Sequence, residues 1–204
     1  MYRHRKKEKD SYGVVGLGRF GHAFAMELVD SGQDILVIDR DEEKVRELRE
    51  YTENAFVVKT LDKKTLSETG IQNCDVAVVC IGEQIDTSIL TTLHLVSMGI
   101  PRVIAKAASE MQGAVLQRVG ADRVVYPDKD MAARLARTLL APSVLDYIEV
   151  AEGVSVLELK SPLQFVGKTL AESRIRKLYG VTVLVLVAED RQVSFDAQPG
   201  GVAG

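Results

Sequence analysis

From residue 11 to about residue 126, short apolar runs alternate with longer segments in which apolar residues recur every three or four positions. The short runs predict strands at residues 12–15, 35–38, 55–58, 75–81, 102–105 and 123–126. The longer segments predict helices at about residues 19–30, 42–51, 85–98 and 110–119, with a shorter helix after the third strand. This alternation predicts an α/β fold, a Rossmann-type doubly wound parallel sheet with strand order 3-2-1-4-5-6.

A further amphipathic segment, residues 128–140, begins after the sixth strand, when the sheet is already complete. It is expected either to cover the last strand or to act as a crossover helix that packs on another subunit. Beyond it, β-rich segments at residues 154–159 and 181–187 enclose a short helix at residues 170–178. We therefore expect a flexible leader (1–10), an N-lobe (11–126), a crossover helix with linker (127–148) and a small α+β C-lobe (149–204).

A glycine-rich turn joins the first strand to the first helix. Gly16, Gly18 and Gly21 have the G-x-G-x-x-G spacing, and Asp39 ends the second apolar run. Gly16 permits a tight turn, Gly18 lets the backbone approach a phosphate, and Gly21 lets the helix pack closely on the strand. The helix N-terminus favours an anion, and Asp39 is placed to accept hydrogen bonds from ribose hydroxyls. The pattern predicts a mononucleotide or dinucleotide site, and Asp39 disfavours a ribose that carries a 2′-phosphate.

Ligands of doubly wound sheets bind beyond the carboxyl ends of the strands, so the loops at that edge define the expected site. Besides residues 127–129, these loops contain Gly16, Leu17, Gly18, Arg19, Phe20, Gly21, Asp39, Arg40, Lys59, Thr60, Leu61, Cys80, Ile81, Gly82, Glu83 and Lys106. Arg19 and Lys106 are the cations best placed for phosphate charge. For Lys106, a plain surface role is an equal alternative.

Composition limits the classes of function. The 204 residues are 46% hydrophobic and 27% charged with a net charge of −3, which is typical of a globular protein and leaves no basic footprint for nucleic acid. The two cysteines, Cys74 and Cys80, form no C-x-x-C motif, and we expect reduced, buried thiols. No signal peptide is visible, and no apolar segment approaches the roughly 20 residues that cross a bilayer. We expect a cytoplasmic protein that reaches a membrane only through a partner.

The residues near the glycine motif show no arrangement typical of oxidoreductase catalysis. Such enzymes usually place a His, a Tyr/Lys pair or a Cys against the nicotinamide. His22 follows the last glycine, where a solvated or packing residue is expected, His94 lies in mid-helix, and Tyr147 has no Lys four residues later. The sequence therefore indicates a protein that binds a nucleotide without transforming it, with a small NAD-dependent oxidoreductase as the alternative.

Four segments together resemble the RCK (also called KTN) family, specifically the cytosolic gating subunits of Ktr and Trk potassium transporters. They are GLGRFG at residues 16–21, LTTL at 90–93, GADRVVYPDKDM at 120–131 and VLDYI at 144–148. The third and fourth are more specific than the glycine motif, which all Rossmann proteins share. The resemblance extends from residue 11 to about residue 194.

This resemblance implies a nucleotide-sensing regulatory subunit. Homodimers, paired through the crossover helix, would assemble into an octameric ring that docks beneath a membrane potassium-translocating subunit, at the inner face of the cell membrane. ATP and ADP, or NAD and NADH in some members, would occupy the glycine cradle, with Arg19 at the terminal phosphate and Lys106 near the phosphates. Differential binding of two ligands would then move a gate. A different cation transporter or exporter remains an alternative, because the partner is encoded elsewhere.

Two positions depart from the family pattern. The acid after the proline, often a glutamate associated with a divalent cation in Ktr-type members, is the shorter Asp128 here. The resemblance leaves two interpretations open, a Mg²⁺, Ca²⁺ or Mn²⁺ ion at the dimer interface or a helix N-cap. After Phe195 the family continues with another acidic turn and a closing apolar strand, so we also expect a shortened C-lobe here. This disfavours cyclic di-AMP, which some family C-lobes bind around the segment matching Arg174, Ile175 and Arg176.

Overall fold

The computed structural model describes residues 10–140, 144–151 and 154–186. Contacts within the chain divide it into two compact units, residues 1–136 and residues 137–204. The basic leader before residue 10, the linker at residues 141–143 and the end of the C-lobe from residue 187 lie outside the described residues. The four segment boundaries expected from the sequence stay predictions.

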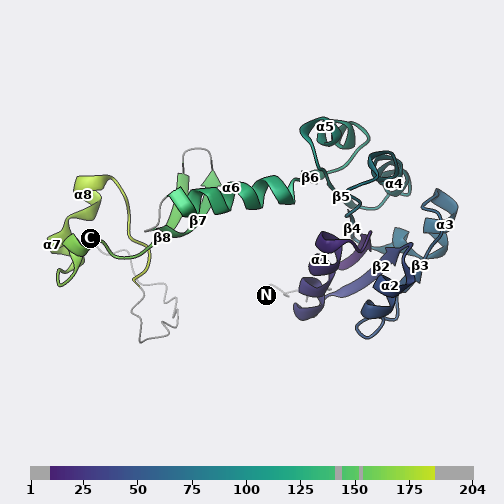
Figure 1. The fold of residues 1–204 in the computed structure, drawn as a ribbon, viewed down its shortest axis with the longest axis horizontal. Coiled ribbons are helices and arrows are strands. Elements are labelled where there is room, and N and C mark those ends of the chain that lie inside the picture. The colour runs from purple at the N-terminus through teal and green to yellow at the C-terminus, as the bar shows by residue number, and fades with distance from the viewer. Residues whose placement is uncertain (1–9, 141–143, 152–153, 187–204) are drawn as a thin grey trace, which may run out of the picture. The chain divides into compact units, whose positions relative to one another are not determined.

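The first unit is built on one parallel sheet (Figure 1). Its strands are β1 (Ser11–Val15), β2 (Asp34–Asp39), β3 (Ala55–Val57), β4 (Val76–Val79), β5 (Arg102–Lys106) and β6 (Arg123–Val125). Their spatial order is β3-β2-β1-β4-β5-β6, and every neighbouring pair is parallel. The predicted Rossmann-type sheet and its strand order are thus confirmed.

The helices that connect these strands are α1 (Arg19–Asp30), α2 (Glu42–Leu48), α3 (Lys63–Glu68), α4 (Ile85–Ser97) and α5 (Glu110–Arg118), with a 3₁₀ turn at Ile71–Asn73. Only α2 differs clearly from expectation, because it ends at Leu48 instead of continuing to residue 51. The hydroxyl of Thr52 donates a 2.8 Å hydrogen bond to the carbonyl of Ile35 in β2. This bond draws the chain back to the sheet, where it must enter β3.

Helices cover both faces of the sheet, because successive strand residues point to opposite sides. On one face, Val14, Val37 and Val78 pack in a cluster with Ala25 of α1 and with Val45 and Leu48 of α2. On the other face, Val15, Ile38 and Val79 pack in a cluster with Leu66, Leu95 and Leu116 of α3, α4 and α5. Figure 1 shows these two layers of helices. The packed sheet therefore holds the loops at its carboxyl edge on a rigid support.

The remaining elements are α6 (Pro127–Leu140), the antiparallel pair β7 (Val144–Ala151) and β8 (Val154–Leu159), a 3₁₀ turn at Leu163–Phe165, α7 (Leu170–Ser173) and α8 (Ile175–Tyr179). The single helix predicted at residues 170–178 is therefore two helices. Arg174 separates them, since its φ of 49° places it in the left-handed region.

The sequence predicts a strand at residues 181–187. This prediction is wrong for residues 181–186, which form no strand. In the described part of the chain, β7 and β8 pair only with each other. A β-rich composition predicts a strand only where a neighbouring strand takes up its hydrogen bonds. Residue 187 lies outside the described residues.

Candidate functional site

The turn between β1 and α1 has the shape that its glycines permit. Gly16 has a φ of 95°, and its N–H donates to the carbonyl of Ile38 over 2.8 Å. A Cβ at Gly21 would lie 1.9 Å from the Gly16 carbonyl oxygen, so a larger residue cannot let α1 start this close to the turn. A Cβ at Gly18 would meet no atom within 4 Å, because this position faces open space.

The N-terminus of α1 carries no side-chain cap. Gly18 occupies the capping position, and the first turn contains no acidic residue. His22 is the first residue of the helix whose N–H donates backwards, to the Gly18 carbonyl over 2.9 Å. The N–H groups before it have no helical acceptor, and the positive end of the helix dipole lies at the same place. This turn therefore offers an anion-binding geometry beside a space that a side chain at residue 18 would fill.

A cavity of about 400 Å³ opens beside this turn at the carboxyl edge of the sheet. Its volume is in the range of roughly 300–1,000 Å³ that is typical of small-molecule sites. Among the residues predicted from the sequence, it is lined by Gly16, Gly18, Arg19, Phe20, Asp39, Arg40, Leu61, Cys80, Ile81, Gly82, Glu83, Lys106 and Asp128. Loops that are far apart in the sequence thus meet at one site.

Four predicted residues, Leu17, Gly21, Lys59 and Thr60, do not line this cavity. Leu17 is buried and Gly21 packs against the turn, so both support the site from beneath. The hydroxyl of Thr60 donates a 2.6 Å hydrogen bond to Asp62, the N-cap of α3. This bond, with those from Thr65, lowers the pKa of the Asp62 carboxyl to about 2.

The carboxylate of Asp39 ties the glycine turn to the end of β2. One oxygen accepts a 2.5 Å hydrogen bond from the N–H of Leu17, and the other accepts a 2.8 Å bond from the N–H of Asp41. An ionised carboxylate offers about four acceptor positions, so two remain for a ligand hydroxyl. Asp39 is therefore a structural part of the cradle, and the ribose contact expected of it stays a prediction.

Lys106 brings a partly buried positive charge into the cavity. Its side chain is only 15% exposed, and its ammonium lies 3.6 Å from the Asp128 carboxylate and 5.7 Å from the centre of the Phe20 ring. Gly82 lies beside it, since a Cβ there would approach the Lys106 nitrogen to 3.4 Å. The charge of Lys106 thus lies within the cavity, and its role beside a phosphate stays a prediction.

Arg40 reaches across the cavity to a residue that the sequence analysis did not select. Its guanidinium donates to the side-chain oxygen of Gln84, which also accepts a 3.2 Å hydrogen bond from the Thr87 hydroxyl. Lys44, Gln84, Thr87, Ala108 and Ile38 complete the lining. Gln84 and Thr87 follow directly after the loop predicted from β4, so extending that loop by one helical turn would have included them.

Cys80 contributes an uncharged side chain to the lining of the cavity. Burial raises the pKa of its thiol to about 12, which outweighs the opposing effect of the Lys106 charge. A thiol with such a pKa is protonated at neutral pH. Cys80 therefore packs as a small apolar residue, as expected from the sequence.

Asp128 lies in the first turn of α6, one residue after the helix begins at Pro127, so it does not occupy the N-cap position. Its side chain is 85% exposed. No group of three or more His, Cys, Asp or Glu side chains that could hold a metal occurs within residues 10–140, 144–151 and 154–186. The described residues of one chain therefore supply fewer than three such side chains toward the divalent cation expected there, and Asp128 is already paired with Lys106.

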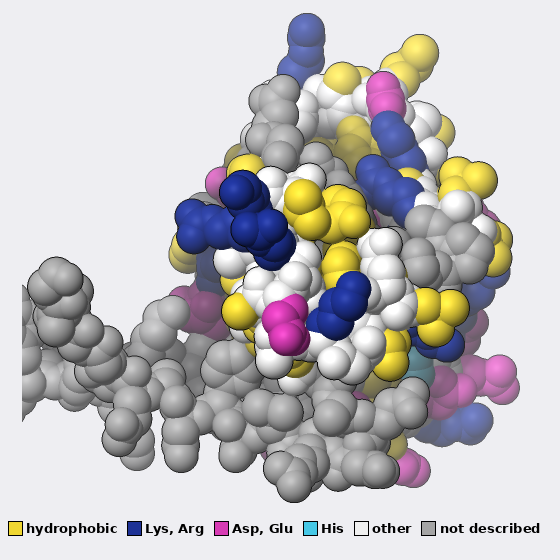
Figure 2. Space-filling view, turned by 90° about the vertical axis from the view of Figure 1, so that its left-hand side faces the viewer, with side chains coloured by type: hydrophobic (Ala, Val, Ile, Leu, Met, Phe, Trp, Pro, Cys, Tyr) yellow, Lys and Arg dark blue, Asp and Glu magenta, His cyan; other side chains and the backbone are white. Residues whose placement is uncertain are grey.

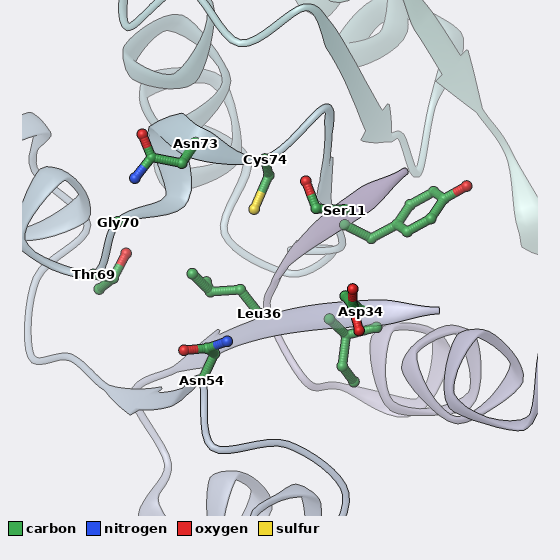
Figure 3. A pocket seen from close by; sticks show the side chains of 10 residues that line it. Ser11, Asp34, Leu36, Asn54, Thr69, Gly70, Asn73 and Cys74 are labelled. Atoms are coloured by element: carbon green, nitrogen blue, oxygen red, sulfur yellow. The ribbon is translucent and has the colours of Figure 1, made fainter. Parts of the chain in front are cut away.

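A second cavity, of about 280 Å³, lies at the opposite, amino edge of the sheet. Leu36 and Cys74 form part of its wall, and Asn54 and Asn73 flank it (Figure 3). Burial, with a smaller effect of the Asp75 carboxylate, raises the pKa of the Cys74 thiol to about 11. None of the site residues predicted from the sequence lines this cavity.

The outer surface includes many exposed hydrophobic side chains. Figure 2 shows such side chains between Lys and Arg residues on the face that it draws. Leu163, Leu178 and Leu184 are among the exposed hydrophobic residues of the second unit. In the part of the chain that the structure describes, no helix is both long and apolar enough to span a bilayer.

Comparison with known proteins shows which family the sequence matches. The model of the TrkA-N domain matches residues 12–127. The Ktr system potassium uptake protein C of Bacillus subtilis is 36% identical over 178 residues, which are 87% of this chain and 80% of that protein.

Two solved structures of GsuK are also similar. The structure of GsuK bound to ADP has 27% identity and a TM-score of 0.53, over 67% of this chain and 35% of that one. The GsuK channel bound to NAD has 19% identity and a TM-score of 0.58, over 86% of this chain and 32% of that one. The second likeness, at this identity, concerns the fold alone.

Proposed function

The chain belongs to the TrkA-N domain family, and we propose that it is a nucleotide-sensing regulatory subunit of a potassium transport system. The resemblance to the RCK family that the sequence indicated is thereby confirmed. The observation that carries the functional proposal is the uncapped N-terminus of α1, which opens onto the cavity beside Gly18. A phosphate group would meet unpaired N–H groups and two cations there.

We propose that ATP and ADP bind this cavity, with NAD and NADH as alternatives. The phosphates would lie at residues 18–21, with Arg19 at the terminal phosphate and Lys106 beside it, and the ribose would lie near Asp39. The space in front of Gly18 supports this placement, as does the similarity to GsuK, whose structure has been solved with ADP. Arg40 donates one hydrogen bond to Gln84, and its other N–H groups stay available to a ligand.

A divalent cation at Asp128 does not fit the described residues of one chain, because they bring no group of three or more His, Cys, Asp or Glu side chains together there. Such an ion would require phosphate oxygens or a carboxylate from a second subunit. We therefore derive no step through a metal and treat its presence as a variable of the experiment.

Assembly is the second part of the proposal. Met131, Leu135 and Leu139 recur every four residues along α6 and are 61%, 58% and 70% exposed. No side chain of α6 is buried. Apolar side chains at this spacing form one stripe of a helix, which is typical of a surface that pairs with another chain. We propose that α6 pairs two subunits, and that further contacts complete an octameric ring in the cytoplasm beneath a membrane potassium-translocating subunit.

Calorimetric titration of the purified protein with ATP, ADP, NAD⁺ and NADH tests this function, with EDTA or with Mg²⁺ or Ca²⁺, while light scattering reports the assembly size. We expect ATP and ADP to bind a ring-sized assembly. Arg19→Ala should narrow the difference between their affinities, because it removes the charge at the terminal phosphate. Arg46→Ala, an exposed residue in the last turn of α2, is the matched control.

The alternatives predict different results. Selective binding of NAD⁺ by a small oligomer, with no response to ATP, would favour a small NAD-dependent oxidoreductase. If Arg19→Ala changed neither affinity, the role of Arg19 would be wrong. Reconstitution with candidate membrane partners would distinguish a potassium uptake subunit from a different cation transporter or exporter.

A further inference from the structure

Lys106 links the proposed phosphate site to the first turn of α6. Its ammonium lies 3.6 Å from the Asp128 carboxylate, and both residues line the same cavity as Gly18 and Arg19. The ammonium is also 5.7 Å from the ring centre of Phe20, which belongs to the first turn of α1. An anion at the N-terminus of α1 would therefore come close to a cation that already has a carboxylate partner.

The two ends of this ion pair differ in their freedom to move. The Lys106 side chain is 15% exposed and is confined beside Gly82 and Phe20, whereas the Asp128 side chain is 85% exposed. An ion pair with one partner in solvent contributes little to stability, because water screens the charges. A phosphate group carries more negative charge than one carboxylate, and it would be held by N–H groups of α1 at the same time. Asp128 is thus the weaker of the two partners for Lys106.

We propose that Lys106 exchanges partners when a phosphate-bearing ligand enters the cavity, and that Asp128 sets the affinity of the site by competing for it. The exchange would remove one of the ion pairs that join the first turn of α6 to the N-lobe, while Lys129 stays paired with Glu110 of α5. We expect the start of α6 to loosen when a ligand occupies the cavity. This inference rests on the proposed function, because it assumes a phosphate at the N-terminus of α1. It assigns to Asp128 a role that needs no metal.

The competition is tested by a double-mutant cycle with ADP as the probe, in EDTA so that no divalent cation takes part. Asp128→Asn should tighten ADP binding roughly twofold to fivefold, which corresponds to an exposed ion pair. The same change in a Lys106→Gln background should leave the affinity for ADP unchanged. Without the Lys106 ammonium, Asp128 and the phosphate no longer compete for the same cation. Asp130→Asn, in the same helical turn but outside the cavity lining, is the matched control and should have no effect in either background.

The outcomes are distinct. If Asp128→Asn tightened binding equally in the wild-type and the Lys106→Gln backgrounds, the cause would be simple charge repulsion and the exchange would be overturned. An Asp128→Asn variant with unchanged affinity would overturn it as well. If the wild-type protein bound no nucleotide at all, the proposed function itself would fail. If it bound ADP while the cycle showed no coupling, only the exchange would be wrong.

Hydrogen exchange measured by mass spectrometry tests the loosening of α6. In the wild type, saturation with ADP should speed exchange in a peptide that spans residues 128–134. In Asp128→Asn the ion pair with Lys106 is already absent, so ADP should change this rate little. Slower exchange with ADP in the wild type would overturn the proposed loosening.

Discussion

The N–H of Leu17 donates a 2.5 Å hydrogen bond to the carboxylate of Asp39, so the glycine turn after β1 is held by the residue that ends β2. The second oxygen of this carboxylate accepts from the N–H of Asp41, which caps α2. One side chain therefore fixes two loops at the carboxyl edge of the sheet. An acid selected for its possible contact with a ribose thus also joins two loops of the cradle.

Asp39→Ala should therefore destabilise the fold as well as weaken nucleotide binding. Both N–H groups would lose a charged acceptor, and the free energy of unfolding should fall by about 2 kcal/mol. Urea denaturation measures this loss, and calorimetry measures the affinity for ADP. Asp34→Ala, at the exposed start of the same strand, is the control and should change neither quantity appreciably. Unchanged stability in Asp39→Ala would contradict the tie between the two loops.

Substitutions at Gly18 and Gly21 should separate binding from folding. Alanine at Gly21 would place its Cβ 1.9 Å from the Gly16 carbonyl oxygen, so the helix must move, and we expect a loss of roughly 1–3 kcal/mol in the free energy of unfolding. Alanine at Gly18 meets no atom within 4 Å, and its φ of −67° suits any residue. Gly18→Ala should therefore keep the stability and weaken ADP binding, because the methyl group enters the phosphate space.

Gly18→Asp is the stronger form of the same test. It places an anion where the phosphate belongs, so binding of ATP and ADP should be abolished while the denaturation midpoint stays near that of the wild type. A Gly18→Asp variant that binds ADP as the wild type does would show that phosphate lies elsewhere.

The hydrogen bond between Thr60 and Asp62 should stabilise the fold in a way that depends on pH. The pKa of Asp62 is lowered from 3.8 to about 2, first by the Thr60 hydroxyl and then by Thr65. A lowered pKa in the folded state means that the stabilisation is complete above the unfolded value of 3.8 and is lost as the pH falls toward 2. Thr60→Val should thus destabilise the protein near neutral pH, and this difference should shrink through that acidic window.

Urea denaturation of the wild type and Thr60→Val over this pH range measures the effect, with Asp62→Asn as the variant that removes the titrating group. Thr60 was also expected at the nucleotide site, yet it does not line the cavity. We therefore expect Thr60→Val to leave the affinity for ADP unchanged. A pH-independent difference in stability would refute the assigned hydrogen bond.

The central fold could be predicted because its signals are local. The apolar runs mark the strands, and the spacing of Gly16, Gly18 and Gly21 fixes a turn whose geometry the structure reproduces. The rule that ligands bind at the carboxyl edge then brought together residues as distant as Arg19 and Lys106, which line one cavity.

Other features depend on contacts that no local pattern contains. The end of α2 is set by a hydrogen bond from Thr52 to Ile35, and the partner of Arg40 is Gln84, which follows a different strand. The β-rich residues 181–186 form no strand, because composition does not supply a neighbouring strand. The partner of Lys106 likewise emerges only when β5 and α6 are seen together.

The exposed stripe of α6 leads to a prediction about assembly. Met131, Leu135 and Leu139 lie on one side of the helix, and burying them against a second chain would remove apolar surface from water. Leu135→Glu places a charge in the middle of this stripe, where pairing would have to desolvate it. We expect the variant to shift toward smaller species in light scattering while its far-ultraviolet circular dichroism stays that of the wild type.

Ala133→Glu provides the matched control, because residue 133 lies on the opposite side of α6 and is also exposed. It introduces the same charge into the same helix and should leave the assembly size unchanged. Equal dissociation by both variants would indicate a general effect of charge on α6. If Leu135→Glu caused no dissociation, the subunits would have to pair through another element. If only Leu135→Glu dissociates, the affinities of the smaller species for ATP and ADP show whether pairing is required to distinguish them.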